Sequence, residues 1–265
     1  MKLAIIGGSG TASLEPFRGW PFKTISTRYG EAVASEGLLA GVSTVFLPRH
    51  GPHHSLPPHL INYRANIAAL KELEVRSAIG ICAVGSADPD LRPGALAVLS
   101  DFIDFTHSRE NTFHEGGEEG VVHTDFSQPY CPVVSEAIVS AGEASGILIR
   151  RKCVYLCVEG PRYETKSEIR MFRQWGADVV GMTNVPEVTL AREAGICYGV
   201  LAAITNFAAG ISPTPLSHDE VLSVMRKMDF KIAQILGRAA RQIRTGRPCS
   251  ECARPAGTES WKHER

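Results

Sequence analysis

The sequence lacks an excess of charge of either sign. Its 265 residues contain 28 lysine and arginine residues and 28 aspartate and glutamate residues, so the formal net charge is zero. A protein that binds nucleic acid or an anionic membrane surface usually carries a basic patch. We therefore expect neither as a partner, and an acidic small ligand has to be held by local groups.

Long hydrophobic runs are also missing. The first six residues lead directly into glycines rather than into the apolar core of a signal peptide, and other apolar runs are short. The seven cysteines are scattered and odd in number, which suits reduced thiols better than a disulfide framework. These features predict a cytoplasmic protein without a membrane segment.

Buried strands alternate with amphipathic helices along the chain. Strands are predicted at residues 3–6, 43–47, 78–83, 96–102 and 154–158. Helices are predicted at 61–73, 133–144, 165–176, 186–195 and 217–246. The alternation predicts one α/β domain in which a central sheet, mostly parallel and mixed in strand direction, is flanked by helices.

Two helix starts carry capping boxes. Thr165 and Glu168 have the required spacing, and Ser217 and Glu220 repeat it at the start of the last helix. We assign residues 1–246 to the domain. Residues 247–265 are rich in proline, serine, glycine and charge, which predicts a flexible tail.

Cys249 and Cys252, in this tail, have the spacing of a redox motif or of half a zinc site. The sequence shows no second pair to complete such a site. We expect two reduced thiols, with a disulfide under oxidation as the alternative.

A glycine loop, residues 7–10, follows the first strand. Its backbone N–H groups and the Ser9 hydroxyl can bind phosphate, although a plain turn is an alternative. A dinucleotide site, as in an NAD-dependent oxidoreductase, is less well matched because the third glycine of G-x-G-x-x-G is missing.

The segment after the second strand, residues 47–54, contains an arginine and three histidines. Arg49 is the one permanently cationic group in this loop, and a guanidinium can hold two phosphate oxygens. The alternative is a metal site built from His50, His53, His54 and His59. Prolines in the segment prevent a helical ligand face and no His-Glu-x-x-His spacing exists, so we predict no metal there.

Glu164 and Tyr163 lie in a loop before the helix that starts near residue 165. A carboxylate accepts the N1–H of a 6-oxopurine but faces a lone pair on N1 of neutral adenine, so Glu164 can discriminate between them. Tyr163 can stack on the base. The alternative for Glu164 is a solvated residue next to a capping box.

Three segments together resemble the trimeric nucleoside phosphorylase family, which includes 5′-methylthioadenosine phosphorylases and 6-oxopurine nucleoside phosphorylases. They are the Glu-Gly-Pro-Arg-Tyr-Glu segment at 159–164, the Gly-Met-Thr-Asn-Val-Pro-Glu segment at 181–187 and the Thr-Asn pair at 205–206. The resemblance covers roughly residues 3–246. It implies the nucleoside phosphorylase fold, a homotrimer with sites near subunit interfaces, and no metal or organic cofactor.

The resemblance also implies roles for individual residues. Phosphate would be bound by Ser9, Arg49, His50, the Ala83 backbone and Thr183. Asn206, Glu164 and His54 would be catalytic. The nucleoside would contact Tyr163, Met182, His218 and, from a neighbouring subunit, His123. Cys82 stands where methylthioadenosine phosphorylases carry threonine, and Asn184 also departs from the usual threonine and is expected to supply a local cap.

Asn206 and His218 bear on the substrate. Family members that use adenine carry aspartate at position 206, whereas 6-oxopurine enzymes carry asparagine, whose amide can donate to O6 and accept from a protonated N7. His218 aligns with a histidine that contacts the 5′-hydroxyl in relatives that cleave inosine and guanosine. Relatives that use methylthio substrates place an apolar side chain there, and an exposed helix-start histidine is the structural alternative.

We therefore predict an enzyme of purine salvage that uses phosphate to cleave a 6-oxopurine nucleoside into free purine and a ribose 1-phosphate. Inosine or guanosine and 5′-methylthioinosine are alternative substrates, and 5′-methylthioadenosine is a third. An NAD-dependent oxidoreductase and a non-catalytic purine-binding protein are the alternatives from other classes.

Overall fold

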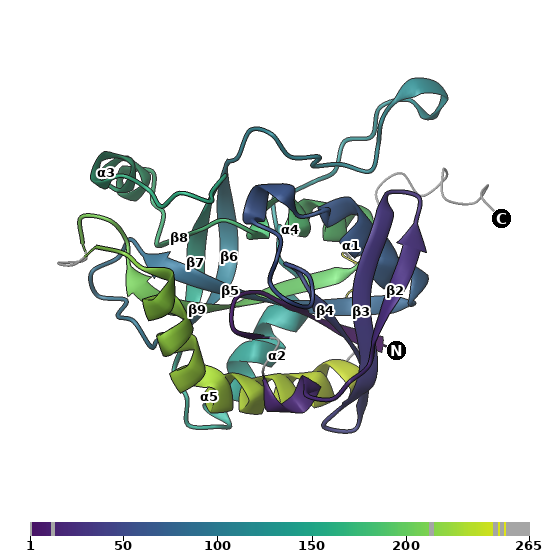
Figure 1. The fold of residues 1–265 in the computed structure, drawn as a ribbon, viewed down its shortest axis with the longest axis horizontal. Coiled ribbons are helices and arrows are strands. Elements are labelled where there is room, and N and C mark those ends of the chain that lie inside the picture. The colour runs from purple at the N-terminus through teal and green to yellow at the C-terminus, as the bar shows by residue number, and fades with distance from the viewer. Residues whose placement is uncertain (1, 12–13, 212–214, 246–248, 250–251, 253–265) are drawn as a thin grey trace.

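The computed structural model describes residues 2–11, 14–211, 215–245, 249 and 252, and strands and helices alternate through them (Figure 1). The strands are β1 (Lys2–Gly7), β2 (Phe22–Thr27), β3 (Gly30–Leu39), β4 (Val42–Pro48), β5 (Val75–Ser86), β6 (Leu96–Phe105), β7 (Ile149–Val158), β8 (Val179–Gly181) and β9 (Cys197–Phe207). The helices are α1 (Tyr63–Glu72), α2 (Pro132–Glu143), α3 (Lys166–Gln174), α4 (Asn184–Glu193) and α5 (His218–Thr245), with short 3-10 helices η2 (Glu15–Phe17), η3 (Pro58–Leu60) and η4 (Gly117–Glu119).

All nine strands belong to one mixed sheet in the order β2-β3-β4-β1-β5-β8-β7-β6-β9. β1 runs parallel to both β4 and β5, whereas β2, β3 and β4 are joined in antiparallel pairs. β9 pairs antiparallel with β6 and also parallel with β5, so that β5, β8, β7, β6 and β9 form a closed ring. The predicted single α/β domain with a mixed central sheet is confirmed.

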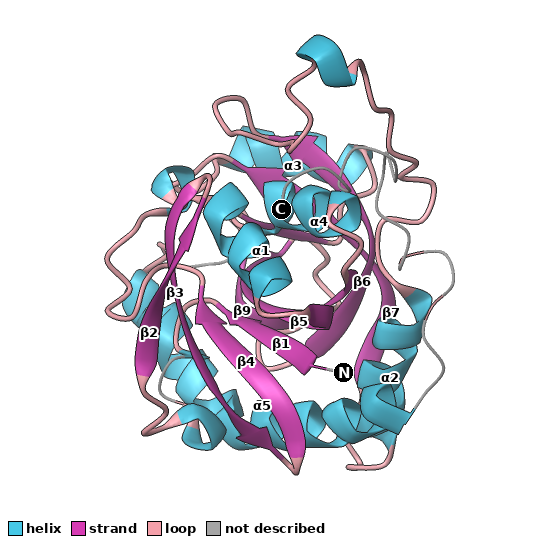
Figure 2. Cartoon of the chain, turned by 90° about the vertical axis from the view of Figure 1, so that its right-hand side faces the viewer, coloured by secondary structure: helices cyan, strands magenta, loops and turns pink. Residues whose placement is uncertain are grey.

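Helices cover the sheet on both faces (Figures 1 and 2). α1 and α4 pack together on one face, and α2 and α5 pack together on the other. β9 is buried along nearly its whole length, as expected for a strand covered on both sides. α5 is 28 residues long, but neither it nor any other helix in the described ranges is apolar over the length needed to cross a membrane.

The capping signals are where the sequence predicts them. The Thr165 hydroxyl accepts from the backbone N–H of Glu168, whose carboxylate accepts from the N–H of Thr165 at 2.7 Å, so the first capping box is confirmed. At α5, Ser217 Oγ accepts from the backbone N–H of Glu220 at 3.2 Å.

The five strand ranges predicted from the sequence match β1, β4, β5, β6 and β7, and no range is predicted for β9 or for β2, β3 and β8. β2 is an edge strand whose side chains are largely exposed, so it lacks the apolar signal of a buried strand. β8 has only three residues. Their pairing partners, rather than local composition, decide their conformation.

Most of the predicted tail, residues 247–265, lies outside the described residues. Cys249 and Cys252 are described and are only 8% and 4% exposed. The prediction of a flexible tail is wrong for these two residues, because both thiols are packed in the hydrophobic core beside α2 and α5.

Candidate active site

A cavity of about 440 Å³ opens where several strands end. Its walls come from the loops after β1 and β4, from the last residues of β5, β8 and β9, and from the start of α5. Ligand sites in α/β proteins form at such strand ends, because the loops that follow neighbouring strands converge there.

The cavity gathers residues that are far apart in the sequence. The predicted site residues that line it are Ser9, Arg49, His50, His54, Ala83, Tyr163, Glu164, Met182, Thr183, Asn206 and His218. His123 is an exposed residue of the segment between β6 and α2, which extends away from the body of the chain (Figure 1). It does not line the cavity of its own chain, and its predicted approach to a neighbouring subunit stays a prediction.

The glycine loop allows a close approach between backbone and side chain. A Cβ atom on Gly8 would lie 2.9 Å from Nη1 of Arg49 and 3.1 Å from the carbonyl oxygen of Ile81, so a larger residue would displace the guanidinium. The next regular element among the described residues is the 3-10 helix Glu15–Phe17, not the long helix of a dinucleotide-binding unit. The NAD interpretation therefore lacks its structural frame.

Arg49 forms a buried ion pair with Glu187 of α4. Nε and Nη2 of Arg49 donate to the two carboxylate oxygens of Glu187 at 2.5 and 2.7 Å. Nη1 donates to the carbonyl oxygen of Ile81 in β5 at 3.0 Å. The sequence alone indicates no role for Glu187, because only the fold brings it next to Arg49, 138 positions away.

The ion pair continues into a buried network of hydrogen bonds. The Tyr198 hydroxyl donates to Glu187 at 2.5 Å and accepts from the Asn184 amide at 3.1 Å, and the Asn184 oxygen accepts from the Tyr130 hydroxyl. Asn184 is therefore a network residue. The expectation that it caps α4 is wrong, because Thr183 occupies the N-cap position.

His50 is a neutral imidazole. Burial, with the nearby Arg49 charge as the next cause, lowers its pKa to about 3. Its Nδ1 lies 2.8 Å from the carbonyl oxygen of Leu56, which can only accept, so Nδ1 carries the proton. Nε2 is then left as a hydrogen-bond acceptor.

Three imidazoles stand in a row along one wall. The His54 ring lies 4.3 Å from that of His50 and 5.8 Å from that of His218, nearly parallel to the latter. His54 has a φ of 53°, a conformation that few non-glycine residues adopt and that is often found at functional sites. Its Nε2 lies 3.4 Å from Ser9 Oγ, and burial lowers the pKa of its imidazole.

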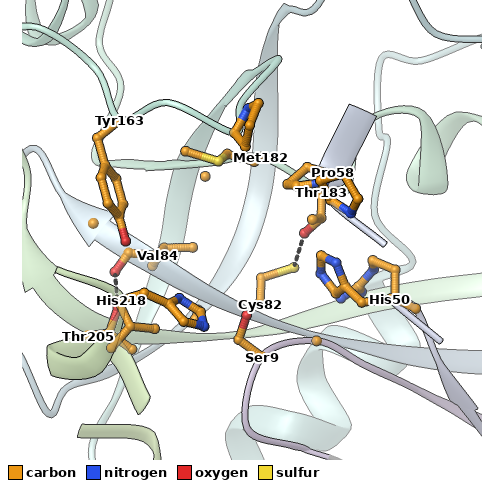
Figure 3. A pocket seen from close by; sticks show the side chains of 18 of the residues that line it. Ser9, His50, Pro58, Cys82, Val84, Tyr163, Met182, Thr183, Thr205 and His218 are labelled. Atoms are coloured by element: carbon orange, nitrogen blue, oxygen red, sulfur yellow. Dashed lines mark hydrogen bonds between the residues drawn. The ribbon is translucent and has the colours of Figure 1, made fainter. Parts of the chain in front are cut away.

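Figure 3 shows Tyr163 at one end of the cavity and His50 and Thr183 at the other, with Met182 between them. The Thr183 hydroxyl lies 3.8 Å from Cys82 Sγ. Burial raises the pKa of the Cys82 thiol, so it stays protonated near neutral pH. Cys82 is both a core residue and part of the cavity wall.

Glu164 and Asn206 are two buried polar side chains toward the Tyr163 end. Glu164 is 8% exposed, and burial raises the pKa of its carboxyl. The interpretation of Glu164 as a solvated residue is therefore wrong. Asn206 is 6% exposed; its Oδ1 accepts from the Thr205 hydroxyl at 2.9 Å and its Nδ2 donates to the Phe207 carbonyl oxygen at 3.0 Å.

The sequence of residues 2–241 matches the family described as the phosphorylase superfamily. The chain belongs to this superfamily. It is 49% identical over 97% of its length to a probable 6-oxopurine nucleoside phosphorylase of Moorella thermoacetica, of which it covers 98%. It is 45% identical over 88% of its length to a probable S-methyl-5′-thioinosine phosphorylase of Methanocaldococcus jannaschii, of which it covers 90%.

A solved methylthioadenosine phosphorylase of Schistosoma mansoni, in complex with adenine, has the same fold with a TM-score of 0.88. It is 33% identical to this chain, and the match covers 93% of each. The chain is therefore a phosphorylase enzyme, and the predicted family is confirmed. The interpretation as a non-catalytic purine-binding protein is set aside.

The Arg49–Glu187 pair predicts a large loss of stability when the guanidinium is removed. Arg49→Ala leaves the Glu187 carboxylate buried without its partner, so we expect the free energy of unfolding to fall by about 3–5 kcal/mol. The measurement is urea unfolding at a fixed protein concentration.

Arg151 provides a matched control, since it pairs with Glu136 and Glu143 but is half exposed. Arg151→Ala should cost much less than Arg49→Ala, because solvent screens an exposed ion pair. Equal effects at the two arginines would contradict a structural role for the buried pair.

Proposed function

We propose that the protein cleaves 6-oxopurine nucleosides with inorganic phosphate, releasing the purine base and a ribose 1-phosphate. The observation that carries this proposal is the pairing of Glu164 and Asn206 as buried polar side chains in one cavity with Ser9, His50 and Thr183. Two relatives named for 6-oxopurine or methylthioinosine phosphorolysis support it.

Phosphate would lie at the His50 end of the cavity. The Ser9 and Thr183 hydroxyls and the Ala83 backbone N–H would donate to its charged oxygens. The β1–β5 pairing reaches only as far as Gly80, so this edge of β5 is open to the cavity at Ala83. Neutral His50 would accept, through Nε2, from the protonated oxygen of a hydrogen phosphate ion.

Arg49 would contribute to this end mainly by position. Each of its three guanidinium nitrogens already donates a hydrogen bond, and its charge is balanced by Glu187. Phosphate would therefore be held largely by directed hydrogen bonds near a compensated cation, with additional donation from the guanidinium.

The sugar would react between the phosphate and the base. Cleavage of the glycosidic bond passes through an oxocarbenium-like state, which a phosphate oxygen near C1′ stabilises and then captures. His54 and Met182 would contact the ribose, and Tyr163 would stack on the base. No step requires a metal or an organic cofactor.

The base end would favour a 6-oxopurine by matching donors with acceptors. The Glu164 carboxylate would accept from N1–H, while the Asn206 amide would donate to O6 and accept from N7 as it gains a proton. Neutral adenine has no proton on N1, so it would leave the carboxylate facing a lone pair. The alternative substrate, 5′-methylthioadenosine, is supported only by relatives and solved structures that bear that name.

A turnover panel across inosine, guanosine, adenosine, 5′-methylthioinosine and 5′-methylthioadenosine, with and without phosphate, tests the proposal. We expect phosphate-dependent release of hypoxanthine or guanine. A native preference for adenosine or 5′-methylthioadenosine would replace the proposal with the methylthioadenosine alternative.

We further propose a cytoplasmic homotrimer in which His123 approaches the neighbouring subunit's site.

Asn206→Asp tests the recognition of the base. The carboxylate would face O6 acceptor to acceptor, which costs about 1–3 kcal/mol, or roughly five- to 160-fold in kcat/KM for inosine. Adenosine should gain less, because Glu164 would still face a bare N1. The measurement is kcat/KM for both nucleosides, and an unchanged ratio would show that Asn206 does not contact the base.

The raised pKa of Glu164 predicts a pH-dependent preference. As pH falls, this carboxyl takes up its proton at a higher pH than an ordinary glutamate, for which the pKa is about 4.3. The neutral acid accepts more weakly from N1–H and can donate to N1 of adenine. The inosine-to-adenosine ratio of kcat/KM should therefore decrease as the pH is lowered. Dividing the two efficiencies cancels the titration of phosphate.

Glu164→Gln is the control for that experiment, because a side-chain amide does not titrate in this range. Its ratio should be flat across the same pH range. A native ratio as flat as that of the variant would remove Glu164 from base recognition.

His218→Leu tests the 5′ end. The imidazole lines the cavity beside His54, so its loss should remove about 1 kcal/mol of transition-state stabilisation for inosine and lower its kcat/KM roughly fivefold. For 5′-methylthioinosine, kcat/KM should rise, because the methylthio group would contact the apolar leucine side chain. Parallel changes for the two nucleosides would indicate that His218 does not contact the 5′ substituent.

A further inference from the structure

Four cysteine thiols meet in the core on the side of the sheet covered by α2 and α5. Cys197 begins β9, Cys131 directly precedes α2, and Cys249 and Cys252 follow α5. Their sulfur atoms all lie within 4.8 Å of one another, and all four residues are buried. Cys249 and Cys252 have no second cysteine pair near them in the sequence, but the fold brings Cys131 and Cys197 next to them.

The arrangement has the dimensions of a tetrahedral zinc site. A Zn–S bond of about 2.3 Å places neighbouring sulfur atoms about 3.8 Å apart at tetrahedral angles. The observed sulfur positions fall within 4.8 Å, so small side-chain rotations would bring them to that spacing. The two-residue gap between Cys249 and Cys252 is a common spacing for two zinc ligands on one short loop.

The chemistry of the ligands points to the same metal. Four thiolates with no carboxylate or imidazole select zinc or an iron–sulfur type of centre, and a single four-coordinate site fits zinc. All four positions would be filled by protein sulfur, which leaves none open for substrate. Such closed sites stabilise folds rather than catalyse reactions.

We propose that Cys131, Cys197, Cys249 and Cys252 bind one structural zinc ion. Binding releases the four thiol protons to solvent. The resulting negative charge lies next to the N-terminus of α2, whose helix dipole favours it at Cys131. The zinc ion joins the chain beyond α5 to the starts of β9 and α2.

This site is separate from the cavity. None of the four cysteines is among the residues that line it. Cys197 and Asn206 lie near opposite ends of β9, nine residues apart, which is about 30 Å along a strand. Zinc should therefore change the stability of the protein with little effect on turnover at moderate temperature.

The first test is metal analysis of the full chain, expressed without a polyhistidine tag in medium containing zinc and purified under reducing conditions. We expect about one zinc ion per chain. Cobalt(II) exchanged into the protein should show sulfur-to-cobalt charge-transfer absorption and the strong visible bands of a tetrahedral thiolate site. Both measurements use the native protein, so their outcome does not depend on whether a cysteine variant folds.

The second test compares Cys252→Ala with Cys153→Ala. Cys153 is an equally buried cysteine of β7 outside the cluster. Cys252→Ala should lower the zinc content below about 0.1 ions per chain and lower Tm, with unchanged kcat/KM for inosine. Cys153→Ala should keep both its zinc and the sulfur-to-cobalt absorption.

Three results with the native protein would overturn the proposal. They are the absence of bound metal after reconstitution with zinc under reducing conditions, iron in place of zinc, and disulfide-linked peptides among the four cysteines in the reduced preparation. Zinc that stays bound in Cys252→Ala would also overturn it, because the metal would then lie elsewhere.

Discussion

The ion pair between Arg49 and Glu187 is the interaction on which the site depends. It connects the loop after β4 to α4, and through Ile81 and Tyr198 it reaches β5 and β9. These segments carry the groups proposed to bind phosphate. Charges buried this deeply are costly unless every hydrogen bond is made, so the pair tolerates little movement of its neighbours. The consequence is a rigid frame for the end of the cavity at which phosphate is proposed to bind.

The electrostatic character of that end differs from what its composition suggests. The segment 47–54 looks strongly basic in the sequence, yet Glu187 balances Arg49, and His50 has a pKa of about 3. The loop therefore offers oriented dipoles and a lone pair rather than a positive charge. Such a site can distinguish hydrogen phosphate, which has both donor and acceptor oxygens, from anions that only accept.

Much of this site follows from the sequence because local motifs end strands of one sheet. Residues at the ends of neighbouring strands lie near one another. The sequence therefore predicts that Ser9, His50 and Asn206 share one cavity. Thr165 and Glu168 likewise specify a helix start through four consecutive residues. The strand-end motifs and the helix start have local physical causes, so short stretches of sequence are enough to predict them.

The features that the sequence did not show depend on contacts between distant segments. In the sequence, Glu187 has the features of an ordinary helix residue. Its ion pair with Arg49, which follows β4, is visible only in the structure. Cys131 and Cys197 carry no spacing that relates them to Cys249 and Cys252, because their proximity depends on how α2 packs beside β9. The exposed position of His123, outside its own cavity, is likewise visible only in the fold.

The pairing of β9 with both β5 and β6 affects how copies of the chain can associate. The β6–β9 pairing spans only residues 96–98 and 201–203, but it closes the ring and so removes one of the two borders that a sheet of this size would otherwise have. Within the described strands, β2 is left as the open border, at the far end from the ring. β2 is therefore an open edge to which a strand of another copy could add. The cavity lies at the ring strands β5, β8 and β9, away from β2, so an assembly around it would use loop and helix surfaces, whose side chains specify one geometry.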